Sequence, residues 1–219
     1  MRWLLDLLST SIGKKVLMAL TGLFLVLFLA VHLYGNLYLY VGEEAFNHHA
    51  EAISGSALIR IVEVVLFLAI VAHAASGVQL TIRNRRARPQ RYRVKRRAGF
   101  STLASRSMIV SGSVVFIFIV VHLRNFFYEA RFGRAAAGES LYRVVTETFA
   151  LPGYAALYVI AMILLGLHLA HGFLSALRTL GIEHQRYTPL LRGVGLVLAV
   201  GFAAAFASMP IAFFARSLA

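Results

Sequence analysis

The sequence predicts an all-α integral membrane protein, a bundle of five transmembrane helices forming a single domain over residues 1–219. Hydrophobic residues make up 59% of the chain and charged residues 14%, and the mean hydropathy is +0.75. This composition excludes an ordinary soluble domain. About 20 apolar residues cross a hydrocarbon core of ~30 Å as a helix. Five segments qualify, at residues 16–41, 57–82, 107–128, 153–177 and 193–215.

Basic residues indicate the orientation of these segments. Ten of the 22 lysines and arginines lie in the loop 83–106, between the second and third segments. Others precede the first segment, at Lys14 and Lys15, and follow the fourth. The positive-inside rule therefore predicts a cytoplasmic N-terminus and an external C-terminus. Topology also explains the net charge of +13 without nucleic acid.

The remaining features of the chain are few. Residues 2–11 (RWLLDLLSTS) form an amphipathic stretch that would lie on the inner membrane surface or dock against a partner, and no cleavable signal peptide is evident. Pro152 suits the first turn of the fourth helix, where its missing N–H costs little. The absence of cysteine excludes disulfides, iron–sulfur clusters and thiolate haem ligation within this chain. We recognise no internal repeat.

Each of the first four segments carries one deeply placed histidine: His32, His73, His122 and His168. His32 is 17 residues beyond Lys15 and His122 is 16 beyond Arg106, which puts both ~24–26 Å from the inner-side charges at the helical rise per residue. His73 and His168 each lie ten residues before an arginine, or ~15 Å from it. Two layers ~10 Å apart result, with His32 and His122 outer and His73 and His168 inner.

Histidines in the hydrocarbon layer need partners, so they are functional-site hypotheses by default. Two pairs at matching depths are typical of axial ligands for two haems, and bis-imidazole iron suits electron transfer. Gly35, Gly77 and Gly172, within a turn of three of these histidines, would let a flat macrocycle approach the backbone. In the alternative, each histidine hydrogen-bonds a hydroxyl or carbonyl of a neighbouring helix.

The other histidines are weaker candidates. His48, His49 and His184 lie in polar loops, and we expect them to be solvated. His171, three residues after His168, competes for the ligand position, and its alternative role is a hydrogen bond to a haem propionate on the inner side. A further candidate for a propionate contact is Arg124, on the outer side. On the inner side, propionates or a second quinone pocket would be contacted by Ser175 and Arg178, together with Ser76, Arg83 and Arg106.

Polar residues near the outer end of the bundle are candidates for quinone binding. They are Glu63, Asn36, Tyr38 and Asn125, with Tyr128 near the same surface. Glu63 is suited to proton exchange with a quinone, but the simpler explanation is an i,i+3 ion pair with Arg60. The tyrosines also fit an interfacial aromatic belt, and Arg124 also fits a snorkelling side chain.

An ordered set of motifs resembles the two-haem cytochrome b anchor of succinate:quinone oxidoreductases, the b558 type. The resemblance runs from about Ser11 to beyond Pro189. Its landmarks are SIGKKVLMALTGLFLVLFLAVHLYGNL, GEEAFN, LIRIVEVVLFLAIVAHAASGVQL, VVHLRNF and GLHLAHGFLSALRTLG. In the family pattern the fourth ligand lies five residues before the Phe-Leu-Ser stretch, which selects His168 over His171. The family pattern also pairs the first ligand with the third and the second with the fourth, which are the pairs that the depths predict.

The resemblance implies the following expectations. Two haem b groups would link a flavoprotein and an iron–sulfur subunit to a quinone, usually menaquinone, in a bacterial plasma membrane. The complex would be a succinate dehydrogenase or a fumarate reductase, with no succinate chemistry on this chain alone. Membrane lipid and further copies of the complex are the other expected partners. The alternatives are a cytochrome b anchor of formate dehydrogenase or hydrogenase, and a non-redox scaffold or transporter.

Overall fold

The chain is described by a computed structural model over residues 10–87 and 101–219, with side chains described from Met108 onward in the second range. Regular structure in these ranges is entirely helical. Five stretches are long and apolar enough to cross a membrane. They are Ser11–Val41, Ala57–Arg86, Met108–Arg131, Pro152–Thr179 and Thr188–Ser217. The prediction of an all-helical, multi-pass membrane protein is confirmed at this level.

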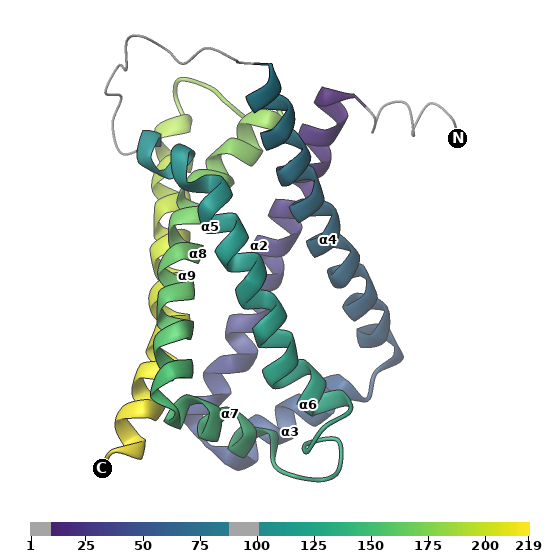
Figure 1. Ribbon diagram of the computed structural model, residues 1–219, viewed down its shortest axis with the longest axis vertical. Coiled ribbons are helices and arrows are strands. Elements are labelled where there is room, and N and C mark those ends of the chain that lie inside the picture. Colours follow the sequence, from purple (N-terminus) through teal and green to yellow (C-terminus); the bar gives the residue numbers. More distant parts are fainter. Residues whose placement is uncertain (1–9, 88–100) are drawn as a thin grey trace.

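The long helices alternate in direction along the long axis of the molecule (Figure 1). The elements are α2 (Ser11–Val41), α3 (Glu43–Ser54), α4 (Ala57–Arg86), α5 (Ser101–His122), the π-helix η1 (Leu123–Phe127), α6 (Tyr128–Arg131), α7 (Leu141–Ala150), α8 (Pro152–Thr179) and α9 (Thr188–Ser217). The start of α2, the end of α4 and the α8–α9 connection lie at one end. The C-terminus lies at the other, where the short helices α3 and α7 cross the bundle.

The predicted loop over residues 83–106 is too long at both ends. Helix α4 continues to Arg86, and α5 already begins at Ser101. Arginines extend α4 because a positive charge in the last turn interacts favourably with the carbonyl end of a helix. The fifth helix likewise begins at Thr188, five residues before its predicted start. The N-terminal amphipathic stretch, up to residue 9, and loop residues 88–100 lie outside the described residues.

Local sequence determines where several helices begin and end. Thr10 caps α2, its hydroxyl accepting from the N–H of Gly13 at 2.9 Å, as small hydroxyl residues do at helix starts. Gly42 separates α2 from α3 with φ of 137°, a conformation that favours glycine. Pro152 occupies the first turn of α8, as predicted.

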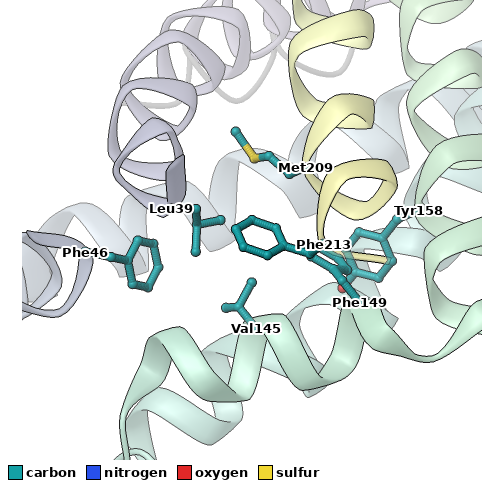
Figure 2. Close-up of a cluster of buried hydrophobic side chains, with 7 residues drawn as sticks. All are labelled: Leu39, Phe46, Val145, Phe149, Tyr158, Met209 and Phe213. Atoms are coloured by element: carbon teal, nitrogen blue, oxygen red, sulfur yellow. The ribbon is translucent and has the colours of Figure 1, made fainter. Parts of the chain in front are cut away.

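Two short amphipathic helices, expected to be loops, form part of a buried core. Figure 2 shows this core at the end of the bundle that carries α3 and α7. It contains Leu39, Phe46, Val145, Phe149, Tyr158, Met209 and Phe213. These side chains come from α2, α3, α7, α8 and α9. The sequence interpretation took the polar residues of α3 and α7 as loop signals, whereas their apolar side chains anchor both helices to the bundle.

Burial is unequal among the long helices. Helix α8 has eight buried residues, several of them packed against α9 in a cluster with Ala199 and Phe202. Helix α4 has two, Ser76 and Leu80. The remaining α4 side chains include many exposed large hydrophobics, which suit a lipid-facing surface. The tightest part of the bundle is therefore the α8–α9 pair, and α4 lies at its margin.

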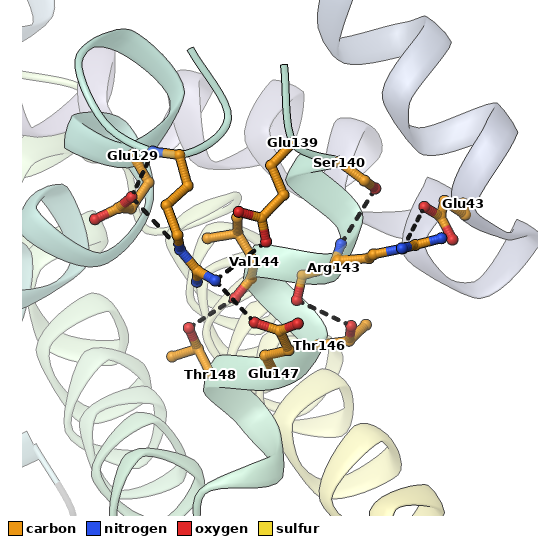
Figure 3. Close-up of polar contacts among 10 residues, drawn as sticks. Glu43, Glu129, Glu139, Ser140, Arg143, Val144, Thr146, Glu147 and Thr148 are labelled. Atoms are coloured by element: carbon orange, nitrogen blue, oxygen red, sulfur yellow. Dashed lines mark hydrogen bonds and ion pairs between the residues drawn. The ribbon is translucent and has the colours of Figure 1, made fainter. Parts of the chain in front are cut away.

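Glu129, Glu139 and Glu147 lie around the connection before α7 (Figure 3), and Arg134 contacts all three of them. The guanidinium of Arg134 hydrogen-bonds Glu147 at 3.0 Å and Glu139 at 3.1 Å, and its backbone N–H donates to Glu129 at 2.9 Å. The hydrogen bond to Glu147 and the surrounding carboxylates raise the pKa of Arg134, which is solvent-exposed. Arg143 donates to Glu43 at 3.0 Å, joining α7 to α3. These contacts order the surface above the core.

Candidate functional site

The four deeply placed histidines lie in two pairs, each joining two helices. The rings of His32 on α2 and His122 on α5 have centroids 5.7 Å apart, with an interplanar angle of 85°. The rings of His73 on α4 and His168 on α8 have centroids 6.2 Å apart, with an angle of 70°. These are the two combinations that depth along the helices predicts. Four helices thus contribute one imidazole each.

The His32–His122 pair has an aromatic environment. Phe28 stacks on His32 with centroids 5.2 Å apart, and Phe118 and Phe126 lie 5.7 and 5.3 Å from His122. Tyr158 lies 6.0 Å from His122. Such rings exclude water and provide flat apolar walls. The pair therefore lies in a largely apolar enclosure.

Three buried polar atoms beside His122 have no hydrogen-bond partner within the described part of the chain. They are Nδ1 of His122, Nδ2 of Asn125 and the hydroxyl of Tyr158. An unsatisfied buried donor or acceptor costs about 1–3 kcal/mol. The five-residue π-helix begins directly after His122, and π-helical turns occur frequently at functional sites. An imidazole with an uncommitted buried nitrogen suits a site that binds a further group.

The inner pair has hydrogen-bonding partners on neighbouring helices. Nδ1 of His73 lies 3.2 Å from the carbonyl oxygen of Met18 and 3.3 Å from Oγ1 of Thr21. Nδ1 of His168 lies 3.5 Å from Oγ of Ser111, at the outer limit of a hydrogen bond. A carbonyl oxygen only accepts, so Nδ1 of His73 carries the proton in this contact. Its Nε2 is then the nitrogen that has a free lone pair.

The glycines that contact the site are not those expected. A Cβ on Gly35 would meet His49 at 3.2 Å, one on Gly172 would meet Met108 at 3.9 Å, and one on Gly77 would have no atom within 4 Å. A Cβ on Gly22 would instead lie 3.1 Å from Cε1 of His73, and one on Gly112 would lie 3.3 Å from Cε1 of His168. The helices therefore approach the inner imidazoles at Gly22 and Gly112.

The donor chemistry of the paired histidines can be compared with the groups that imidazoles bind. Each pair brings together two imidazoles from two different helices. A pair of neutral imidazoles suits a metal whose other positions are filled by a macrocycle, as in haem. The donor chemistry of the paired imidazoles fits such a group.

The candidates for propionate contacts have partners of their own. Arg178 donates to Glu183 at 2.8 Å. Arg124 donates to Glu129 at 2.9 Å and lies 4.5 Å from the centroid of the Tyr128 ring. Ser175 and His171 are half-buried on α8. Arg83 is exposed and Ser76 is buried, and the side chain of Arg106 lies outside the described residues.

The quinone candidates occupy separate environments. Glu63 pairs closely with Arg131 as well as with Arg60 at 3.8 Å, so the expected i,i+3 pair is present but secondary. Asn36 donates to the carbonyl of His32 at 2.8 Å. Asn125 lines a pocket of about 220 Å³ with Arg124, Glu129, Arg134, Val144, Thr148 and Tyr154. Within the described ranges, hydrogen bonds, ion pairs and ring contacts do not join these candidates to one another. The four are Glu63, Asn36, Tyr38 and Asn125.

The expectation that His49 is solvated is wrong. Its ring stacks on that of Tyr38, with centroids 4.4 Å apart and an angle of 11°, and it is half-buried. The hydroxyls of Tyr38 and Tyr34 are 2.9 Å apart. His48 on the same helix is exposed, as expected. Predicting a helix over residues 43–54 would have distinguished His48 from His49, because adjacent residues of a helix face different directions.

The sequence and structure together define a multi-pass helical membrane protein with two pairs of facing histidines. Comparisons with models of protein families, with curated proteins and with solved structures find no match for this chain.

Proposed function

We propose that this chain is a diheme cytochrome b membrane anchor of a succinate:quinone oxidoreductase. The observation that carries the proposal is the pairing of His32 with His122 and of His73 with His168, from four different helices. The ordered motifs of the b558-type family support the same assignment. Hydrogen-bonded core histidines, the alternative, would leave no reason for the buried Nδ1 of His122 to lack a partner.

The residues of the chain would hold and orient the cofactors. Neutral imidazoles of the four histidines would bind two haem irons, the outer one through His32 and His122 and the inner one through His73 and His168. When bound, the haems would supply one-electron transfer between the iron–sulfur subunit and quinone. Contacts at Nδ1 of His73 and His168 would fix the ring orientation of the two inner ligands, as they do for metal-bound histidine in general. The apolar rings around His32 and His122 would keep water out.

The two ends of the bundle would have different partners. The end with the start of α2 and the end of α4 would be cytoplasmic, because it carries most of the basic residues. There the flavoprotein and iron–sulfur subunits would dock, with anionic lipid at the remaining arginines. Quinone would react near the opposite end, where Asn36, Tyr38, Glu63 and Asn125 lie. The host membrane would be a bacterial plasma membrane, and the quinone would be menaquinone.

Spectroscopy of the purified complex tests the haem assignment. A dithionite-reduced minus oxidised spectrum, with haem quantified as the pyridine haemochrome, should show two low-spin b haems per chain. His32→Ala and His122→Ala should remove the same spectral component, and His73→Ala and His168→Ala the other. His48→Ala, an exposed histidine, is the matched control and should retain both. A wild-type complex without haem would refute the electron-transfer function.

The identity of the partners is tested separately. A subunit with covalently bound flavin should co-purify with the chain and oxidise succinate or reduce fumarate in the presence of quinone. A molybdenum or nickel enzyme in its place would assign the chain to formate dehydrogenase or hydrogenase. Glu63→Gln should lower quinone turnover while leaving both haem spectra intact. Unchanged turnover would exclude Glu63 from proton exchange with quinone.

A further inference from the structure

The two helices that carry the outer histidines share a pattern of residues. Residues 18–33 and 108–123 both read Met-x2-(Thr/Ser)-Gly-x5-Phe-x3-His-Leu, and they end just after His32 and His122. A shorter pattern, His-x3-Gly-x5-Arg, occurs at residues 73–83 and 168–178, starting at the inner histidines. The expectation that the chain has no internal repeat therefore needs correction. The short motifs recur although the intervening loops differ in length.

The repeated positions make the same contacts in the structure. Thr21–Gly22 on α2 lies against His73 on α4, and Ser111–Gly112 on α5 lies against His168 on α8. We call each of these a hydroxyl–glycine pair. The glycine of each pair is ten residues before the outer histidine of its own helix. Helices α2 and α5 therefore each carry one outer histidine and contact one inner histidine.

The hydroxyl oxygen of each pair is placed to accept a hydrogen bond from Nδ1–H of the imidazole. Oγ1 of Thr21 donates to the carbonyl of Leu17 at 2.7 Å, which leaves its lone pairs for Nδ1 of His73. Oγ of Ser111 donates to the carbonyl of Met108 at 3.3 Å and faces Nδ1 of His168 in the same way. Both contacts favour the tautomer in which Nδ1 is protonated, and hence Nε2 as the metal-binding nitrogen.

The glycine of each pair sets how closely the helix approaches the imidazole. A Cβ at position 22 would lie 3.1 Å from Cε1 of His73, and at position 112 it would lie 3.3 Å from Cε1 of His168. Both separations are shorter than ordinary van der Waals contact between carbon atoms. An added methyl group must therefore displace the ring or separate the helices. The displacement should be larger at Gly22.

We propose that Thr21–Gly22 and Ser111–Gly112 are equivalent positioning units, each holding one inner histidine in the orientation and tautomer required for iron binding. The proposal rests on the proposed function for the identity of the bound metal. The contacts with His73 and His168 stand independently of it. Since both inner histidines serve one haem, changes on α2 and α5 should affect the same centre, although each helix also carries a ligand of the other haem.

Redox potentiometry of the purified complex tests this proposal. The component lost in His73→Ala identifies the inner haem. Gly22→Ala and Gly112→Ala should each shift the midpoint potential of that component and weaken haem retention on the order of tenfold, the effect usual for residues that orient metal ligands. The outer component should keep its potential. Gly201→Ala is the matched control, because a Cβ there would have no atom within 4 Å.

Two outcomes would overturn the proposal. One is that Gly22→Ala and Gly112→Ala act on different components, or on both components equally. The other is that they behave like Gly201→Ala. Removing the Ser111 hydroxyl tests the same idea with a smaller change: Ser111→Ala should shift the inner component, and Ser113→Ala, two residues away and exposed, should not.

A second measurement separates failure of this proposal from failure of the haem assignment. Nitrogen-15 NMR of the full chain with labelled histidine, reduced and in lipid, reports each tautomer, with His73→Gln and His168→Gln assigning the signals. Both inner histidines should carry the proton on Nδ1. Ser111→Ala should change the His168 signals, while Thr21→Val should change those of His73 less, because the Met18 carbonyl remains. Protonation on Nε2 in the wild type would refute the positioning role, with or without haem.

Discussion

A methyl group added at Gly166 should destabilise the bundle, because this glycine lies on α8 directly against α9. A Cβ built on Gly166 would lie 2.9 Å from Cβ of Ala203 and 3.3 Å from the carbonyl oxygen of Ala199. Neither atom is the end of a flexible side chain, so the helices themselves must separate. Small residues at such contacts let helix backbones pack closely in membranes, where van der Waals packing drives helix association.

The size of the effect can be worked out by comparison with Gly201→Ala on α9. Overpacking a well-packed interior costs about 1–3 kcal/mol, and replacing glycine by alanine in a helix returns up to about 1 kcal/mol. The second contribution is common to both variants, because both sites are helical. Only Gly166 has the close contacts. The free energy of unfolding should therefore differ between the two variants by about 1–3 kcal/mol, Gly166→Ala being the less stable.

Steric trapping in detergent micelles, which measures the free energy of unfolding at equilibrium, is a suitable assay. The wild-type chain and the two variants would be compared under one condition. Equal stabilities for the two variants would refute the reasoning, since they would mean that α8 and α9 have room for the methyl group. A more stable Gly166→Ala variant would refute it more strongly.

Three further variants test the end of the bundle that carries α3 and α7. Arg131→Gln should cost about 1–2 kcal/mol in unfolding experiments, because the pair with Glu63 is partly buried, whereas Arg60→Gln should cost little since Arg60 is 60% exposed; equal costs would contradict this ranking. Tyr158→Phe should be neutral or stabilising by about 1 kcal/mol, because within the described ranges the buried hydroxyl makes no hydrogen bond of good geometry, its interaction with Asn125 falling short of one; a marked loss of thermal stability would show that this interaction is a true hydrogen bond. Asn47→Ala should cost about 1–2 kcal/mol in chemical denaturation, because the Asn47 amide bonds Ser140 at 2.8 Å and the N–H of Tyr142 at 3.0 Å; an unaffected midpoint would mean that α3 docks without these bonds.

Hydropathy and helix length were sufficient to predict the long helices and which of their histidines lie side by side. Both follow from regular helix geometry, so residue counts from Lys15 or Arg83 translate directly into position. The short helices were missed because their stability comes from tertiary packing of a few apolar side chains, such as Phe46 and Phe149, rather than from composition.

The contacts around the histidines were predicted less well, because they depend on how neighbouring helices are rotated. Gly77 lies within a turn of His73, yet Gly22 on another helix is the glycine that meets its ring. Similarly, Arg60 is the obvious partner of Glu63 in sequence, but Arg131 pairs with it more closely. Aligning the helices with one another, rather than considering each alone, would have singled out Thr21–Gly22 and Ser111–Gly112.

The sparse packing of α4 has a consequence for the order of assembly during membrane insertion. Helix α4 has two buried residues against eight in α8, yet it supplies the inner-layer His73. Helices held by few contacts open most easily, so α4 should dock last and remain the most labile until the inner centre is complete. Amide exchange in haem-depleted chains should then be fastest along α4, and equal protection in α4 and α8 would contradict this order. If the chain binds haem as proposed, the cofactor would enter at this margin of the bundle before α4 docks.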